Sequence, residues 1–206
     1  MPASTGYLNG FLLHDLILDS AQKHPNSVAL VYDKNQWTYL ELSTQVKDVS
    51  VSLAGLGLQR MDRVGIYLEK CFEFVVSVFA VSCAGGVFVP INHILKGAQI
   101  QHILNDCQVT ILVTSAERFP LIESIIPQCP HLKTIIIKGE KELIPTKFDN
   151  IILWKNLFQK KTAVNIHRVI DADVVSIFYT SGSTGKPKGV VLSHKNMVAG
   201  ANSVAS

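Results

Sequence analysis

Short runs of branched apolar residues alternate with longer helical segments through the middle of the chain, and this rhythm limits the folds that the sequence can adopt. Val- and Ile-rich runs at residues 63–68, 87–91, 109–114 and 134–138 show no polar–apolar alternation. Strands of this kind are covered on both faces, and the helices between them then act as right-handed crossovers. The sequence therefore predicts an α/β fold with a mainly parallel, doubly wound sheet and flanking helices.

Helical spacing of apolar residues marks the segments around these strands. Expected helices include residues 71–84, which are apolar nearly all round, and a short one at 120–126. Thr38 and Glu41 have the spacing of a capping box, in which each side chain bonds the other residue's backbone N–H at a helix start. A helix is therefore expected to begin directly after Thr38.

The rhythm changes after the fourth of these strands. Residues 139–168 are interrupted by Lys, Pro and Asn, so we expect a surface excursion there, with one short helix around 152–158. A further strand is expected at 174–179. Ser193 has the position of an N-cap, and the apolar stripe of the helix that it opens continues to Ser206. Since a domain rarely stops inside an amphipathic helix, we expect residues 1–206 to be an incomplete domain.

A glycine- and hydroxyl-rich stretch follows the strand at 174–179 and has the composition of a polyphosphate cradle. Glycines let a backbone approach an anion and turn its N–H groups toward it, and Lys186 and Lys188 add positive charge. A Walker loop would need Gly at position 180 and Ser or Thr at position 187, where this chain has Thr and Pro. No GxGxxG follows any expected strand, so a dinucleotide fingerprint is also absent.

This stretch closely resembles the phosphate loop of the adenylate-forming, or AMP-binding, superfamily. The segment reads Tyr179-Thr180-Ser181-Gly182-Ser183-Thr184-Gly185-Lys186-Pro187-Lys188-Gly189. Two earlier segments, 37–42 (WTYLEL) and 84–92 (AGGVFVPIN), also resemble that superfamily and stand in the expected order. The exit at 191–194 (VLSH) is more similar to acyl-CoA ligases than to the adenylation domains of peptide synthetases.

The resemblance implies a two-step reaction in which a carboxylate and ATP give an acyl-adenylate and pyrophosphate, and a thiol then takes the acyl group. The implied acceptor is CoA, and Mg²⁺ is implied with ATP. A loop of this kind holds the β- and γ-phosphates by hydrogen bonds and positive charge. The residues that would do so here are Thr180, Ser181, Gly182, Ser183, Thr184, Gly185, Lys186 and Lys188.

The resemblance also implies that the catalytic lysine, the magnesium ligand and a C-terminal domain follow the loop in the superfamily, beyond Ser206. No catalytic residue and no metal ligand are therefore assigned within this sequence. His93 and His194 are interpreted as structural, and Tyr179 as packing. Three hypotheses stay open: part of an acyl-CoA ligase, inactive by itself; part of a domain that loads a carrier protein; or a non-catalytic nucleotide-binding or interaction module.

Composition excludes some other classes of function. A net charge of +3 with scattered lysines does not indicate a nucleic-acid partner. The most apolar stretch, 74–89, is shorter than a membrane span and contains glycines, and no signal peptide is evident. Four cysteines without CxxC spacing indicate reduced thiols, and we expect a cytoplasmic protein. The acyl substrate and the oligomeric state stay open.

Overall fold

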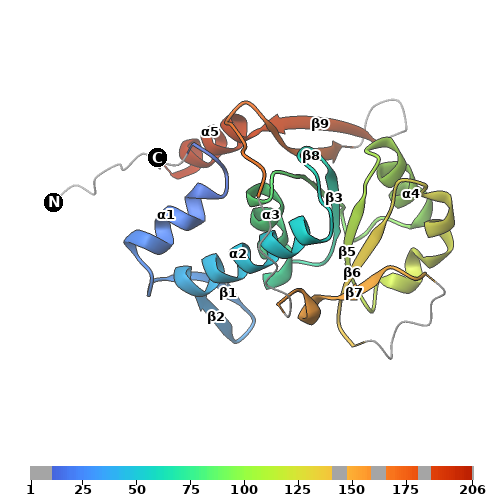
Figure 1. Cartoon of the computed structure of the whole chain (residues 1–206), viewed down its shortest axis with the longest axis horizontal. Coiled ribbons are helices and arrows are strands. Elements are labelled where there is room, and N and C mark those ends of the chain that lie inside the picture. Colours follow the sequence, from blue (N-terminus) through green and yellow to red (C-terminus); the bar gives the residue numbers. More distant parts are fainter. Residues whose placement is uncertain (1–10, 141–147, 159–165, 181–186, 206) are drawn as a thin grey trace.

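A seven-stranded sheet forms the centre of the molecule (Figure 1). The computed structural model describes residues 11–140, 148–158, 166–180 and 187–205. The strands lie in the order β7-β6-β5-β3-β4-β8-β9, and every neighbouring pair is parallel except the antiparallel pair of β8 and β9. Their bounds are β3 (Arg63–Tyr67), β4 (Val87–Pro90), β5 (Ile111–Ser115), β6 (Thr134–Lys138), β7 (Ile151–Leu153), β8 (Val174–Thr180) and β9 (Lys188–Ser193). The predicted mainly parallel sheet is confirmed.

Helices cover both faces of this sheet, as the runs of Val and Ile predict. Successive strand residues point to opposite faces, so Ile66 packs with α2 (Tyr39–Gly55) and α3 (Phe72–Cys83), whereas Tyr67 packs with α4 (Gly97–Asp106). Two separate apolar cores result, one on each face. Figure 1 shows α2 and α3 on one side of the strands and α4 on the other. The doubly wound arrangement is therefore confirmed.

The first part of the chain lies against the α2 face. Helix α1 (Asp15–Lys23) is followed by an antiparallel hairpin of β1 (Val28–Tyr32) and β2 (Asn35–Thr38). The predicted capping box is present at the start of α2: the Glu41 carboxylate accepts from the Thr38 N–H at 2.7 Å, and the Thr38 hydroxyl oxygen accepts from the Glu41 N–H at 3.3 Å. These bonds satisfy two backbone donors that a helix start otherwise leaves without partners.

Two expectations for local structure were only partly right. The surface excursion contributes an edge strand, because β7 pairs in parallel with β6, and a 3-10 helix at Trp154–Phe158 follows it. The short helix expected around 152–158 is therefore present over its last five residues, and its first two belong to the strand because they pair with β6. The single short helix expected at 120–126 is a pair of 3-10 helices, Phe119–Leu121 and Glu123–Gln128. Pro127 lies inside the second one, and a proline has no N–H to continue an α-helical ladder.

Helix α5 (His194–Ala205) closes the described part of the chain and begins where the sequence predicts. Ser193 and Asn196 bond each other's backbone: the Ser193 hydroxyl oxygen accepts from the Asn196 N–H at 3.2 Å, and the Asn196 side-chain oxygen accepts from the Ser193 N–H at 3.0 Å. Within the described ranges, no helix combines the length and the apolar character that crossing a membrane requires.

Candidate phosphate-binding site

The two ends of the predicted phosphate loop are held by one antiparallel strand pair. Thr180 is the last residue of β8 and Lys188 the first of β9, and the two are Cα partners in the ladder. Both are exposed. The structure therefore brings two of the eight predicted phosphate-binding residues together. The other six lie outside the described residues: Ser181, Gly182, Ser183, Thr184, Gly185 and Lys186.

The loop leaves the sheet at the edge formed by the carboxyl ends of the parallel strands. The chain runs from β3 to β4 on one side and then to β5 on the other side of β3, so the direction of winding reverses at β3. In open α/β sheets, ligands bind outside the carboxyl ends of the strands at such a reversal. The fold thus places the predicted loop and the winding reversal along one edge of the sheet.

A mostly apolar cavity of about 280 Å³ lies at this edge beside Tyr179, which directly precedes the loop. Its walls come from the ends of β3, β4 and β8 and from α3 and α4. The lining residues are Leu68, Lys70, Phe74, Pro90, Ile91, Asn92, His93, Leu95, Ile103, Phe178 and Tyr179. A group bound at the loop would therefore have apolar surface within reach on the β4 side.

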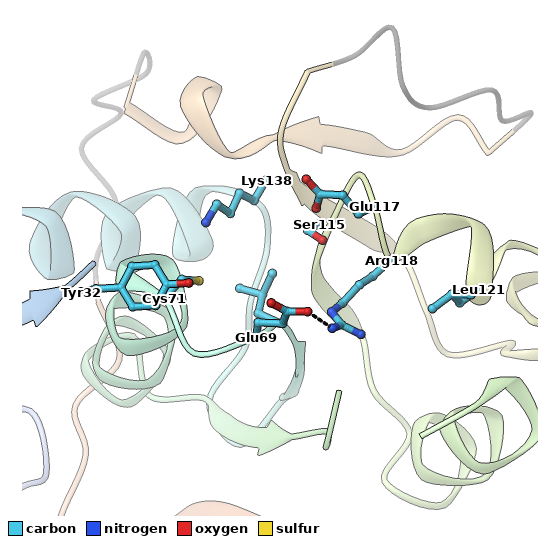
Figure 2. Close-up of a pocket in the computed structure, with 9 residues that line it drawn as sticks. Tyr32, Glu69, Cys71, Ser115, Glu117, Arg118, Leu121 and Lys138 are labelled. Atoms are coloured by element: carbon cyan, nitrogen blue, oxygen red, sulfur yellow. Dashed lines mark hydrogen bonds and ion pairs between the residues drawn. The ribbon is translucent and has the colours of Figure 1, made fainter. Parts of the chain in front are cut away.

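A second cavity, of about 380 Å³, lies farther along the same edge and is shown in Figure 2. It is polar: Lys138, Glu117 and Ser115 border it from the ends of β5 and β6, and Glu69 and Arg118 form an ion pair in its wall. The remaining lining residues are Tyr32, Leu68, Cys71 and Leu121. Its charges are balanced, with two basic and two acidic side chains, so the cavity is not a second site for a polyphosphate.

Arg118 ties three loops of this edge together, and sequence analysis did not single it out. Its guanidinium pairs with Glu69 after β3, donates to the His93 carbonyl after β4 at 2.8 Å, and lies 5.2 Å from the centre of the Tyr67 ring. The Arg118 side chain is only 12% exposed. A signal was present, because Arg118 follows a predicted strand by a few residues and so had to lie at the carboxyl edge.

Nearby ionisable groups are held in fixed charge states. The Lys138 ammonium lies 2.9 Å from the Glu73 carboxylate. Burial alone would lower the pKa of Lys138, but its interactions with Glu73 and Cys71 together outweigh burial, and the pKa is raised. A hydrogen bond from Ser115 lowers the pKa of Glu117. Burial raises the pKa of the Cys71 thiol, which therefore stays protonated and is a poor nucleophile.

The two histidines that the sequence singles out are engaged in structural contacts. The carbonyl of His93 accepts from Arg118, as described above. His194 is 1% exposed, and its Nδ1 accepts from the Leu13 N–H at 3.0 Å. Burial lowers the pKa of His194 to about 4, so its imidazole is neutral near pH 7. The contacts of His194 agree with its structural interpretation, whereas the His93 side chain is exposed and lines the apolar cavity, so its structural role stays a prediction.

The described residues hold no metal cluster of their own: among them, no three His, Cys, Asp or Glu side chains gather around a common point. Mg²⁺ that accompanies ATP is commonly held by one or two carboxylates, by water and by the substrate phosphates, so the ion that the resemblance implies stays an expectation.

Comparison with known proteins shows which family the chain resembles. The profile of the family described as "AMP-binding enzyme" matches residues 17–205, which include the β8–β9 pair and the loop between its strands. The chain is 30% identical over 187 residues to a crotonobetaine/carnitine–CoA ligase from Salmonella paratyphi A, covering 87% of this chain and 36% of the relative. It is 29% identical over 192 residues to tyrocidine synthase 1 from Brevibacillus parabrevis, covering 93% and 16%.

A solved structure gives the same picture. The crystal structure of an anthranilate CoA ligase in complex with anthranoyl-AMP matches with a TM-score of 0.81 and 30% identity, over 95% of this chain and 37% of that one. The chain thus spans little more than a third of the length of these CoA ligases. Because the family profile matches nearly the whole sequence, the chain belongs to the AMP-binding enzyme family of adenylate-forming ligases.

Proposed function

We propose that this chain forms the ATP-phosphate-binding part of a ligase that activates a carboxylic acid as an acyl-adenylate and passes the acyl group to the thiol of CoA. The observation that carries the proposal is the segment from Tyr179 to Gly189, which joins β8 to β9 at the carboxyl edge of the sheet. A phosphate-binding segment is expected at this edge in a doubly wound fold. The family match supports the same reaction class.

The chemistry would divide into two displacements. A carboxylate oxygen attacks the α-phosphorus of ATP, the bond from that phosphorus to the bridging oxygen breaks, and pyrophosphate leaves. A thiol sulfur then attacks the acyl carbon, a thioester forms, the thiol proton passes to solvent, and AMP leaves. In the first step the charge on the departing pyrophosphate grows, and Lys186, Lys188 and the loop N–H groups would neutralise it.

The thiol acceptor is the finer part of the proposal. CoA is favoured by the segment Val191-Leu192-Ser193-His194, whose sequence is similar to that of acyl-CoA ligases. Tyrocidine synthase 1 and gramicidin S synthase 1 match this chain with nearly the same identity as the CoA ligases. A carrier protein therefore stays the alternative acceptor. The longer protein, incubated with ATP, a carboxylate panel and CoA, should release acyl-CoA. Acyl transfer to a carrier protein alone would show that the acceptor is wrong while the activation step stands.

Residues 1–206 would be an incomplete N-terminal AMP-binding domain, because the matched stretch makes up only 36% and 37% of the matched CoA ligases. We therefore expect no carboxylate-dependent exchange of pyrophosphate into ATP by these 206 residues alone. Measurable exchange by the purified chain would overturn that expectation. The working compartment would be the cytoplasm, which is supported by four free cysteines, three of them buried.

Phosphate binding can be tested on this chain directly. Lys188→Ala should weaken the binding of ATP and of pyrophosphate, measured by titration calorimetry, by about tenfold, because it removes a charged donor to phosphate. Lys195→Ala, at an exposed position in α5, makes the same change in charge and is the matched control. Equal weakening by both variants would mean that only net charge matters and would contradict the assigned site.

A further inference from the structure

We propose that helix α4 positions the phosphate loop by anchoring the stems on both sides of it, through Asp106 on one stem and His102 on the other. The structural part of this inference stands on contacts among described residues; its role in binding phosphate rests on the proposed function. His102 and Asp106 are four residues apart on α4, so they lie one turn apart on the same helix face.

The stem before the loop is anchored at Tyr179. The Tyr179 hydroxyl donates to the Asp106 carboxylate, and the Cys107 sulfur lies 3.1 Å from the same hydroxyl oxygen. Since the phenol has one hydrogen and gives it to Asp106, the Cys107 thiol is the donor in the second bond. Burial and the bond to Asp106 raise the pKa of Tyr179, so the phenol stays protonated. The packing role expected for Tyr179 is therefore incomplete.

The stem after the loop is anchored at Pro187. The His102 Nε2 atom lies 3.2 Å from the Pro187 carbonyl oxygen. A carbonyl can only accept, so Nε2 carries the hydrogen and donates it. A proline has no backbone N–H, so this carbonyl is the one hydrogen-bonding group that its backbone can offer. The His102 ring also meets the Tyr179 ring edge-on, with 6.3 Å between centroids. One side chain of α4 thus touches both stems.

Helix α4 is itself fixed to the sheet, which makes it a suitable anchor. Ile100, Ile103 and Leu104 on its inner face are fully buried. At its C-terminal end, the Arg63 guanidinium of β3 donates to the carbonyls of Cys107 and Gln108. The position of α4 relative to the parallel strands is therefore set by both apolar packing and hydrogen bonds.

The stems need such an anchor because β9 is the last strand of the sheet order. Its other edge has no partner strand among the described residues, and Lys188, Gly189 and Val190 are exposed. Fixing one residue's backbone costs roughly 1–2 kcal/mol, so stems that are held before ATP arrives leave less ordering to be done on binding. Loss of either anchor should therefore weaken the binding of phosphate groups while the sheet stays folded.

One pair of variants tests the anchor at each of the two stems. His102→Gln keeps an N–H donor close to the Nε2 position, whereas His102→Leu removes it. Tyr179→Phe removes only the hydroxyl, and Asp106→Ala removes its acceptor. Gln101→Ala is the control, because Gln101 is on α4 but bonds Gln128, away from the loop. Tyr179→Phe combined with Asp106→Ala should have no larger effect than Tyr179→Phe alone, since the bond to Asp106 is one of the two that the hydroxyl makes.

The first readout is hydrogen exchange of the β8–β9 amides, followed by mass spectrometry on this chain. His102→Leu, Tyr179→Phe and Asp106→Ala should each speed exchange at the stems about tenfold and leave β3 and β5 unchanged, as expected when a side-chain hydrogen bond that holds the stem is lost. His102→Gln and Gln101→Ala should behave as wild type. Stem exchange that is unchanged in the three disruptive variants would overturn the anchor, whatever the protein's function.

The second readout is the binding of ATP and of inorganic pyrophosphate, measured by calorimetry. The same three variants should weaken both by about fivefold to tenfold, with an unchanged melting temperature. Faster stem exchange with unchanged ATP and pyrophosphate binding would overturn the positioning role. Absence of binding by the wild-type chain would overturn the proposed function instead, and the exchange experiment would still decide whether α4 holds the stems.

Discussion

At the scale of single residues, Arg118 shows how one largely covered cation can organise an edge where several loops meet. Arg118 itself follows β5, and its partners lie at the ends of two other strands: Tyr67 and Glu69 at the end of β3, and His93 after β4. Arg118→Met keeps much of the side-chain volume but leaves the His93 carbonyl without that donor. We expect the free energy of unfolding to fall by roughly 2 kcal/mol, as for the loss of a partly buried charge-assisted bond. Urea unfolding followed by circular dichroism measures it.

Two further variants separate geometry from charge at this position. Arg118→Lys should lose an intermediate amount, because an ammonium group cannot serve three partners in the planar geometry of a guanidinium. Lys34→Met, at an exposed turn position, makes the same charge change and should stay within about 0.5 kcal/mol of wild type. If Arg118→Met were as mild as Lys34→Met, the three-loop contact would contribute nothing to stability.

At the scale of elements, the end of α3 shows why two glycines stand before β4. The Gly86 N–H bonds the Val81 carbonyl at 2.9 Å and the Gly85 N–H bonds the Ser82 carbonyl at 3.3 Å, which is the pattern of a Schellman motif. Gly85 has a φ of +83°, and a Cβ there would lie 3.1 Å from the Cβ of His167. We expect Gly85→Ala to lower the free energy of unfolding by about 1–2 kcal/mol, measured by thermal melting.

Gly200 is the matched control for this prediction. It lies inside α5, and an added Cβ would meet nothing within 4 Å. Gly200→Ala should therefore raise the free energy of unfolding by about 0.5–1 kcal/mol, because Ala loses less backbone freedom than Gly on entering a helix. A destabilising Gly200→Ala, or a neutral Gly85→Ala, would show that backbone conformation is not what distinguishes the two positions.

At the scale of the whole molecule, sequence pattern predicted the layers but not the ends of the sheet. Unbroken runs such as Ile135-Ile136-Ile137 indicate cover on both faces, and both faces are covered. Strand β7 was missed because Ile151–Leu153 is short and its apolar residues also fit a helix. Strand β7 is defined by its pairing with β6, and the order of residues within a short segment does not reveal which other strand the segment will pair with.

The position of the candidate loop between two strands was predicted, and its binding of phosphate stays a prediction. The loop from Thr180 to Lys188 was found from its composition and order, and the structure places its two described ends side by side. The residues that hold its stems were not found. His102 and Asp106 have no motif of their own, and their partners at Pro187 and Tyr179 are more than 70 residues away. Such pairs follow from the sheet order, which local spacing does not contain.

Residues near the two ends of the described chain are in contact, and two buried histidines take part in these contacts. The Leu13 N–H, next to α1, bonds Nδ1 of His194 in α5, 181 positions later. The His14 ring lies edge-on to that of His194, with 5.8 Å between centroids, and its Nδ1 lies 3.0 Å from the Ser82 hydroxyl of α3. Burial lowers the pKa of both imidazoles. Three helices are thus held together by groups that must stay neutral.

This arrangement makes stability depend on pH in a defined direction. The pKa of His194 is about 4 in the folded chain against an ordinary 6.5, so between these values the unfolded state binds a proton that the folded state does not. The contribution of His194 to the free energy of unfolding is therefore largest above pH 6.5 and falls as pH drops toward 4, by roughly 3 kcal/mol. His194→Asn keeps an acceptor near Nδ1 but cannot titrate, so its urea midpoint should fall less over this range.

The control is His131→Asn, at an exposed position, which should keep the wild-type dependence of the urea midpoint on pH. Parallel curves for His194→Asn and wild type would mean that acid sensitivity comes from groups other than this contact between the two ends of the chain.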